Sequence, residues 1–347
     1  MRAVRIASAA LVLALILGLA ACGPREGQKV KLKVVYAGSL IVPLQAVEKQ
    51  FESLHPDLEV DMEGHGSIQV IRYVTDLKKQ ADVLAVADYT LIPAMMYPEH
   101  ADWLIRFATN ELVIAYTEKS RYASEISSSN WCEILSRPEV KIGLPHPLLD
   151  ACGYRALMMV QLAEVHYGHP GLFARIVADH FTPAISVRKD RDRYTIDLVE
   201  VMKPRDDKFA VRGGSIQLLA LLEAGAIDYA FEYRSVARQR GLKYVELPPA
   251  LNLGASDQED FYRRVRVAFG FQRFTALENE QVGNTIYYAL TIPKNAPHRS
   301  QALEYVKFLL GPEGQRIFAE NNHPFVPPVA DNPAGLPTEL AGLVKGE

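Results

Sequence analysis

The sequence has few of the residues that would indicate a metal centre or a catalytic site. It contains three cysteines and nine scattered histidines, and no group of them has the spacing of zinc ligands. A serine in a G-x-S-x-G turn is absent, as is a cysteine with a motif histidine. We therefore expect neither an enzyme nor a resident cofactor. The alternative is an enzyme of the hydrolase or transferase type.

The sequence also has no large excess of charge of either sign and no internal repeats. The 38 basic and 41 acidic side chains leave a formal net charge of −3 at pH 7. A nucleic-acid-binding protein usually has a basic patch, so we expect no nucleic-acid partner. Hydrophobic residues make up 49% of the 347 residues, which is enough to fill a sizeable core, and this length favours two domains or lobes.

Residues 1–22 have the pattern of a lipoprotein signal peptide. Arg2 and Arg5 precede an apolar run over 6–19, which is too short to span a bilayer comfortably. The run ends in small residues directly before Cys22, as in the site cut by the lipoprotein signal peptidase. We expect Cys22 to become the lipidated N-terminus, and an uncleaved anchor helix is the alternative.

The expected export bears on the remaining cysteines and on localisation. Residues 23–29 are polar and are expected to form a tether, so that the protein is exported, anchored by lipid and faces the periplasm or the cell exterior. Such a location permits a disulfide. We nevertheless expect Cys132 and Cys152 to be free thiols.

Two consecutive units of strand, small-residue turn and helix follow the tether. Gly38 and Ser39 lie at the first turn, and Gly66 and Ser67 lie at the second. Gly38 lets a ligand approach the backbone, and a serine can donate from both its N–H and its O–H. With a third strand, this βαβαβ order predicts a doubly wound sheet that binds ligands at the carboxyl ends of its strands. The strands are expected at 31–36, 58–62 and 81–87, and the helices at 42–54 and 68–77.

Asp150 stands between a short strand at 141–144 and a helical apolar run at 156–163. An aspartate at such a position caps the helix, and the free N–H groups at a helix start form an anion site when they face a cleft. Capping alone is the commoner role and is the alternative for Asp150. The extended segment 104–116, which precedes this unit, indicates a crossover into a second lobe.

Gly213, Gly214 and Ser215 precede a further helix at 216–223. The charged segment 181–208 before them is typical of a hairpin or an exposed insertion. The expected domain boundaries are 30–110 and 240–330 for lobe I, 111–239 for lobe II and 331–347 for a flexible tail.

Eight segments, distributed over nearly all of residues 31–330, have specific motifs. They are YAGSL (36–40), GSI (66–68), VTDLKKQADVLAVADYTLIP (74–93), RFATNELVIAYTEKS (106–120), DACGYRALM (150–158), LLALLEAGAIDYAFEYRSVA (218–237), KYVELPP (243–249) and KFLLGPEGQRIF (307–318). In these motifs the chain resembles the archaeal-type tungstate and molybdate substrate-binding proteins of ABC transporters.

The resemblance implies an α/β protein of the type II periplasmic-binding-protein fold, with two doubly wound lobes around a central cleft. It implies high-affinity binding of molybdate or tungstate outside the cytoplasm and delivery to the permease and ATPase of an ABC importer. Another tetrahedral oxyanion such as sulfate, or a non-transport sensory lipoprotein of the same fold, is the alternative. We expect a monomer, tied to the membrane by the lipid at Cys22. The oxyanion ligands that the resemblance implies are Gly38, Ser39, Ser67, Asp150, Ala151, Cys152, Ser215 and Tyr233.

The chain departs from the family pattern at one of these positions. In the family, two carboxylates reach the metal centre of the oxyanion and expand it from four ligands to six. Asp150 matches the first carboxylate, but Ser215 stands where the second, a glutamate, is expected. A carboxylate near a doubly charged anion is repulsive unless it bonds the metal, is protonated or points away. We therefore expect a four-coordinate anion, or one with Asp150 as its sole added ligand.

Overall fold

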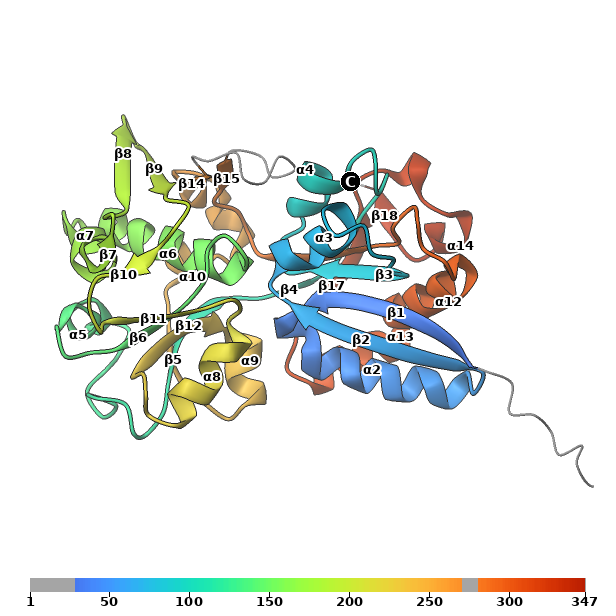
Figure 1. The fold of residues 1–347 in the computed structure, drawn as a ribbon, viewed down its shortest axis with the longest axis horizontal. Helices are drawn as coiled ribbons and strands as arrows, with labels where there is room; N and C mark the ends of the chain where they lie inside the picture. The colour runs from blue at the N-terminus through green and yellow to red at the C-terminus, as the bar shows by residue number, and fades with distance from the viewer. Residues whose placement is uncertain (1–28, 270–279, 347) are drawn as a thin grey trace, which may run out of the picture.

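The computed structural model describes residues 29–269 and 280–346, which form two lobes (Figure 1). The predicted signal peptide, the lipidation site at Cys22 and all but the last residue of the tether lie outside the described residues. Among the described residues, no helix has both the length and the apolar character needed to cross a membrane.

Lobe I is built on a seven-stranded sheet, whose strand order confirms the predicted βαβαβ start of the chain. The first strand pairs in parallel with the second and the third, and the chain returns late to add antiparallel strands. In spatial order the strands are β18 (Lys345–Gly346), β17 (Phe325–Ala330), β4 (Ile105–Thr109), β16 (Tyr287–Thr291), β3 (Val83–Val86), β1 (Val30–Ala37) and β2 (Leu58–His65).

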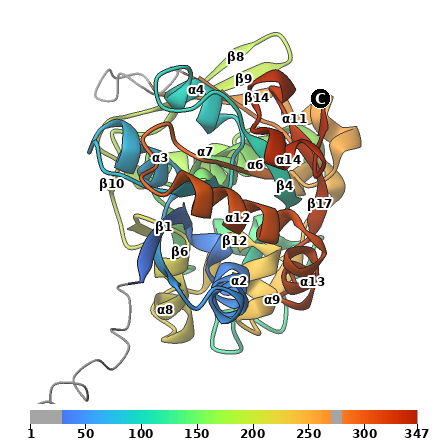
Figure 2. The same cartoon turned by 90° about the vertical axis from the view of Figure 1, so that its right-hand side faces the viewer.

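Helices cover both faces of this sheet, as a doubly wound lobe requires. Figure 2 shows three of them, α12, α13 and α14, together on the outer side of lobe I. The lobe I helices are α2 (Ile41–Leu54), α3 (Ser67–Thr75), α4 (Leu91–Met96), α12 (Arg299–Leu310), α13 (Pro312–Glu320) and α14 (Thr338–Ala341).

Lobe II is built on a five-stranded mixed sheet, and one of the two helices α6 (Ala151–Tyr167) and α8 (Ile216–Glu223) packs on each of its faces. The chain enters it directly from β4 through β5, so the predicted crossover is confirmed. Its first long helix, α6, is buried at every position from Ala151 to Ala163, whereas α8 covers the other face. In spatial order the strands are β11 (Phe209–Arg212), β6 (Ile142–Pro145), β12 (Tyr229–Tyr233), β5 (Leu112–Tyr116) and β13 (Lys243–Glu246).

A second sheet of lobe II contains the predicted hairpin, which stands out from the lobe in Figure 1 as β8 and β9. It is completed by strands that come much later in the chain. Its order is β15 (Glu280–Val282), β14 (Val265–Phe269), β9 (Arg193–Leu198) and β8 (Ser186–Asp190). The remaining elements of lobe II are α5 (Trp131–Ser136), α7 (Leu172–Ile176), β7 (Phe181–Thr182), β10 (Lys203–Pro204), α9 (Arg234–Gln239), α10 (Pro249–Asn252) and α11 (Glu259–Tyr262).

Two expected boundaries need correction. The sequence pattern predicts a return to lobe I at residue 240, but β13 pairs with β5, and β14 pairs with β9, so the chain leaves lobe II only after β15. The strand pattern at 243–246 could not show which sheet it joins, because pairing is a tertiary property. The segment 331–346 is also not a loose tail: Leu340 is fully buried and β18 pairs with β17.

Candidate functional site

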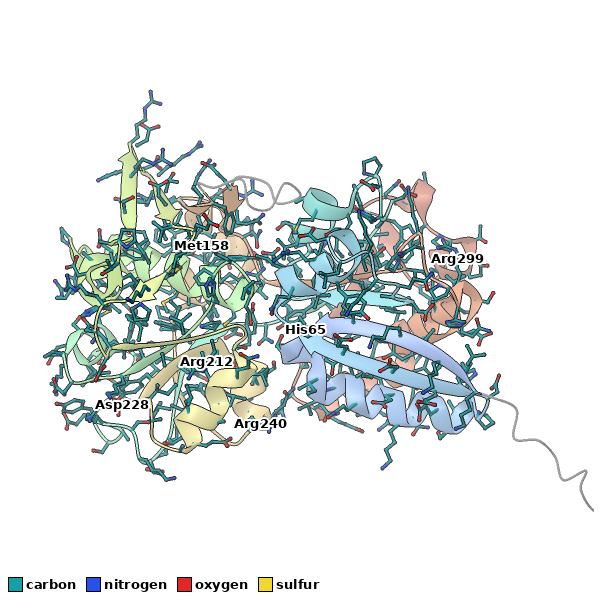
Figure 3. The ribbon with its side chains drawn as sticks, viewed as in Figure 1. His65, Met158, Arg212, Asp228, Arg240 and Arg299 are labelled. Carbon is teal, nitrogen blue, oxygen red and sulfur yellow. The ribbon has the colours of Figure 1, made fainter. Side chains whose placement is uncertain are left out.

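A cavity of about 160 Å³ is enclosed by residues of both lobes. Lobe I contributes the turns before α2 and α3, and lobe II contributes the turns before α6 and α8. His65, which Figure 3 labels where the lobes meet, belongs to the lining. This is the carboxyl end of β1, β2, β6 and β11, where open α/β sheets bind ligands. The lining residues are Gly38, Ile41, Gly64, His65, Gly66, Gln69, Asp150, Gly214, Ser215, Ile216 and Gln217.

Asp150 joins the N-termini of two lobe II helices. Its Oδ1 accepts a hydrogen bond from the Cys152 N–H at 2.9 Å, which caps α6, so the predicted capping role is confirmed. Its Oδ2 accepts one from the Ser215 N–H at 2.9 Å. Burial raises the pKa of Asp150, while the two N–H bonds and the Arg155 charge oppose that rise. Since the Cys152 N–H is occupied, Ala151 supplies the freer N–H, which has no acceptor in the described part of the chain.

Ser39 and Ser67 are buried in lobe I, and each can direct a hydroxyl proton to a ligand. Ser67 Oγ accepts the Ala87 N–H at 3.0 Å, so its own proton stays available. Asn110 Nδ2 donates to Tyr288 Oη at 3.2 Å, and Tyr288 Oη lies 2.9 Å from Ser39 Oγ. Because an amide N–H can only donate, the Tyr288 phenol can donate in turn to Ser39, which leaves the Ser39 proton free.

Arg155 connects lobe II to lobe I. Its Nη1 donates to the Ala87 carbonyl at 2.6 Å and to the Tyr233 phenol at 3.0 Å. Its Nη2 lies 3.0 Å from Asp88 Oδ2, and the same carboxylate oxygen accepts the Tyr154 hydroxyl at 2.6 Å. The Arg155 and Asp88 residues are only 1% and 2% exposed, so this ion pair is removed from water where the lobes meet.

The lobes also touch through their backbones. The Ile68 N–H donates to the Leu149 carbonyl at 3.2 Å. At Gly66, an added Cβ would lie 2.3 Å from the same carbonyl oxygen, closer than real side chains approach. The lobes are therefore in direct contact beside the cavity, the arrangement expected of a closed form, and glycine at position 66 is what permits this contact.

The structure brings the predicted ligands to one place, although at different depths. Gly38, Asp150 and Ser215 line the cavity. The other five are buried and do not belong to that lining. They are Ser39, Ser67, Ala151, Cys152 and Tyr233.

Several polar residues of the site were missed from the sequence. His65 and Gln69 flank the second Gly-Ser turn, and Gln217 follows Ser215 by two positions, so extending each predicted turn by one helical turn would have included all three. Tyr288, behind Ser39, lies in a strand far along the chain and gives no local signal.

The donors that converge here suit an oxyanion. Within residues 29–269 and 280–346, no group of three or more His, Cys, Asp or Glu side chains could hold a metal ion. Cys132 and Cys152 are free, as expected. The lining contains neither lysine nor arginine, so a ligand meets chiefly neutral N–H and O–H groups at the starts of helices.

Comparison with known proteins finds relatives that are similar over almost the whole chain. The chain is 40% identical over 356 residues to the molybdate/tungstate-binding protein WtpA of Pyrococcus abyssi, with 98% of each chain covered. It is 38% identical to the protein of that name from Thermococcus kodakarensis, covering 90% of this chain and 87% of the relative. The resemblance found in the motifs is thus confirmed.

Solved structures show the same fold at low sequence identity. The periplasmic molybdate-binding protein of Azotobacter vinelandii has a TM-score of 0.54 at 15% identity, with 84% of this chain and 98% of that chain covered. The sulfate-binding protein SubI of Mycobacterium tuberculosis has a TM-score of 0.54 at 14% identity, with 85% and 86% covered. The fold is thus the type II periplasmic-binding-protein fold that the motifs implied. Residues 32–321 match the family described as bacterial extracellular solute-binding protein, and the chain belongs to that family.

Proposed function

We propose that this chain binds molybdate or tungstate outside the cytoplasm and delivers the anion to the permease and ATPase of an ABC importer. The observation that carries the proposal is the cavity between the lobes, where the turns before four helices converge without lysine or arginine in the lining. The names of the two WtpA relatives support the choice of anion.

Neutral donors are sufficient for a doubly charged tetrahedral anion in such a site. Hydrogen bonds to an ionised acceptor are roughly twice as strong as those between neutral groups. The N-termini of α3, α6 and α8 add partial positive charge. Asp150 is the carboxylate in the lining, and both of its oxygens accept N–H groups, which reduces its repulsion of the anion.

The same contacts favour an anion that keeps its four oxygen ligands. A carboxylate that ligates a metal turns an oxygen lone pair toward it, and each Asp150 oxygen already uses one of its two lone pairs to accept a backbone N–H. Ser215 offers a hydroxyl donor in place of a second carboxylate. We therefore propose four-coordinate binding, with Ser215 and Ala151 among the donors.

Closure of the lobes is the motion that transport would use. An anion held by donors of both lobes stabilises the closed form over the open one. The Arg155–Asp88 ion pair and the Ile68–Leu149 hydrogen bond form in that closed form. The membrane subunits can then distinguish loaded from empty protein by its shape.

Calorimetric titration of the purified full chain with molybdate, tungstate, sulfate and phosphate tests the proposal. We expect tight binding of molybdate or tungstate and weak binding of the other two. Ser39→Ala removes a hydroxyl donor and should weaken binding about tenfold, whereas the exposed Ser128→Ala should not change it. Binding of sulfate or phosphate alone would assign another oxyanion, and binding of none would contradict the proposal.

We also propose that Cys22 carries the lipid that holds a monomeric protein at the outer face of the membrane. The motif before Cys22 supports this, as does membership of an extracellular solute-binding family. Metabolic labelling with a radioactive fatty acid tests it, because the natural protein should take up the label and Cys22→Ala should not. A natural protein that sits in the membrane fraction without label would indicate the uncleaved anchor helix instead.

A further inference from the structure

A second carboxyl group, that of Glu232, is buried next to the predicted ligand Tyr233. Glu232 is 1% exposed and stands next to the end of β12. Its Oε1 accepts the Tyr233 N–H at 2.8 Å, whereas its Oε2 is buried without a hydrogen-bond partner among the described residues. A buried polar atom without a partner is costly, so it requires an explanation.

The alternation of β12 places Glu232 on the side of the cavity lining. Phe231 and Tyr233 belong to the core that includes α6, whereas Ala230 packs in the smaller cluster with α8. Residues two apart in a strand share a face, so Glu232 lies on the α8 face with Ala230. There the Ser215 hydroxyl, at the N-terminus of α8, is near enough to influence the pKa of Glu232, although it makes no hydrogen bond to the Glu232 Oε2 in the structure.

Burial, together with the nearby Asp150 charge, disfavours the ionised form of Glu232. Burial raises the pKa of Glu232 to about 8, and the nearby Asp150 charge adds to that rise, while the Tyr233 N–H, the Ser215 hydroxyl and Arg240 oppose it. Asp150 is bonded by two N–H groups and lies near Arg155, so it is the member of the pair that keeps its charge.

We propose that Glu232 is a positioning residue of the anion site, acting through Ser215; this rests on the proposed function. When protonated, Glu232 can turn its unpartnered Oε2 to donate to Ser215 Oγ, and this leaves the Ser215 O–H free to donate to the bound oxyanion. When ionised, Glu232 accepts a hydrogen bond from the Ser215 hydroxyl, so that this hydroxyl no longer donates to the ligand. The ionised carboxylate also adds a negative charge beside a doubly charged ligand. Anion affinity therefore falls as Glu232 ionises.

Other groups near Glu232 do not titrate in the relevant pH range. Burial raises the pKa of the Cys152 thiol and of the Tyr233 and Tyr288 phenols well above their ordinary values. Lys208, whose pKa burial lowers to about 8, bonds the Arg137 carbonyl and stands just before β11, at the strand end opposite Gly213 and Gly214. Its contribution is common to all variants of Glu232, so a comparison between them removes it.

Titration of the full chain with molybdate at pH 7.5, 8.5 and 9.5 tests the proposal, because this anion stays doubly deprotonated over that range. The affinity of the natural protein should fall up to about tenfold per unit above pH 8. Titration in buffers of different ionisation enthalpy should show nearly one proton taken up on binding at pH 9.5. Glu232→Gln, which is neutral and keeps a donor, should bind without that pH dependence and without proton uptake.

Three results distinguish the possible failures. Equal pH profiles for the natural protein and Glu232→Gln, or no proton uptake by the natural protein, would overturn the role of Glu232 while leaving molybdate binding intact. A pH dependence that Ser215→Ala leaves unchanged would overturn the route through Ser215. Absence of molybdate and tungstate binding at pH 7.5 would overturn the proposed function itself. Proton uptake is measured on the natural protein, so the test holds even where a variant fails to fold.

Discussion

Arg155 and Asp88 form an ion pair across the two lobes, with Nη2 and Oδ2 3.0 Å apart and both side chains almost fully buried. The pair is linked to two of the predicted anion ligands. Arg155 donates to Tyr233 Oη and to the Ala87 carbonyl oxygen. The N–H of Ala87 in turn donates to Ser67 Oγ. Lobe closure and the placement of ligand donors therefore depend on the same guanidinium group.

Asp88→Asn should weaken anion binding, because it leaves the Arg155 charge uncompensated in the closed form. Removing one partner of a buried ion pair costs about 3–5 kcal/mol, and opening of the lobes relieves part of it, so we expect an affinity loss of about 10- to 100-fold. Small-angle scattering should show that the variant stays more expanded than the natural protein at saturating molybdate.

The matched control is Glu313→Gln, which breaks an exposed ion pair with Arg316 on α13. Exposed pairs contribute little, so its affinity and its compaction on binding should equal those of the natural protein. An Asp88→Asn protein that binds and closes like this control would show that the buried pair does not support closure.

Gly66→Ala should prevent closure by a steric route. The new Cβ would lie 2.3 Å from the Leu149 carbonyl oxygen of the other lobe, whereas the φ of −65° at Gly66 suits alanine, so the open form should be unaffected. We expect molybdate binding to be lost, or weakened at least about 100-fold, with little change in melting temperature.

Gly342→Ala is the control, because a Cβ at Gly342 meets no atom within 4 Å and its φ of −75° is equally permissive. Titration and small-angle scattering of both variants give the comparison. Normal binding by Gly66→Ala would mean that the ligand-bound form is less closed than the structure described here.

The parts of the site that the sequence predicted are those encoded by local pattern. Gly38, Ser39 and Ser67 follow parallel strands, and the carboxyl ends of parallel strands meet at one edge of a sheet, so their convergence could be expected. Asp150 was recognised as a cap because capping depends on residues only two positions apart.

The parts that the sequence missed depend on contacts between distant segments. Tyr288 lies within hydrogen-bond distance of Ser39 although 249 positions separate them in the sequence. Likewise, β13 pairs with β5, which lies much earlier in the chain. Glu232 looks like an ordinary strand residue until its burial and its unpaired Oε2 are known. No periodicity or turn pattern contains such information, because it arises from how the lobes pack.

Asp150→Asn should destabilise the fold, since the carboxylate holds the starts of α6 and α8 together. The amide oxygen can still accept the Cys152 N–H, but the amide nitrogen then faces the Ser215 N–H, and two donors cannot bond. An unsatisfied buried N–H costs about 1–3 kcal/mol, which is the expected loss in the free energy of unfolding by urea. Unchanged stability would mean that Ser215 finds another acceptor.

Glu232→Gln should change how stability of the anion-free protein depends on pH. The folded-state pKa of Glu232, about 8, exceeds the ordinary value of 4.5, so folding favours the protonated form. That contribution is full below pH 4.5 and is lost as the pH rises to about 8, at a cost of at most about 5 kcal/mol. The variant does not titrate, so its stability relative to the natural protein should rise between pH 4.5 and 8 and then stay constant. Urea unfolding across this range measures the difference, and a difference that is the same at all pH values would show that Glu232 is ionised in the folded protein at neutral pH.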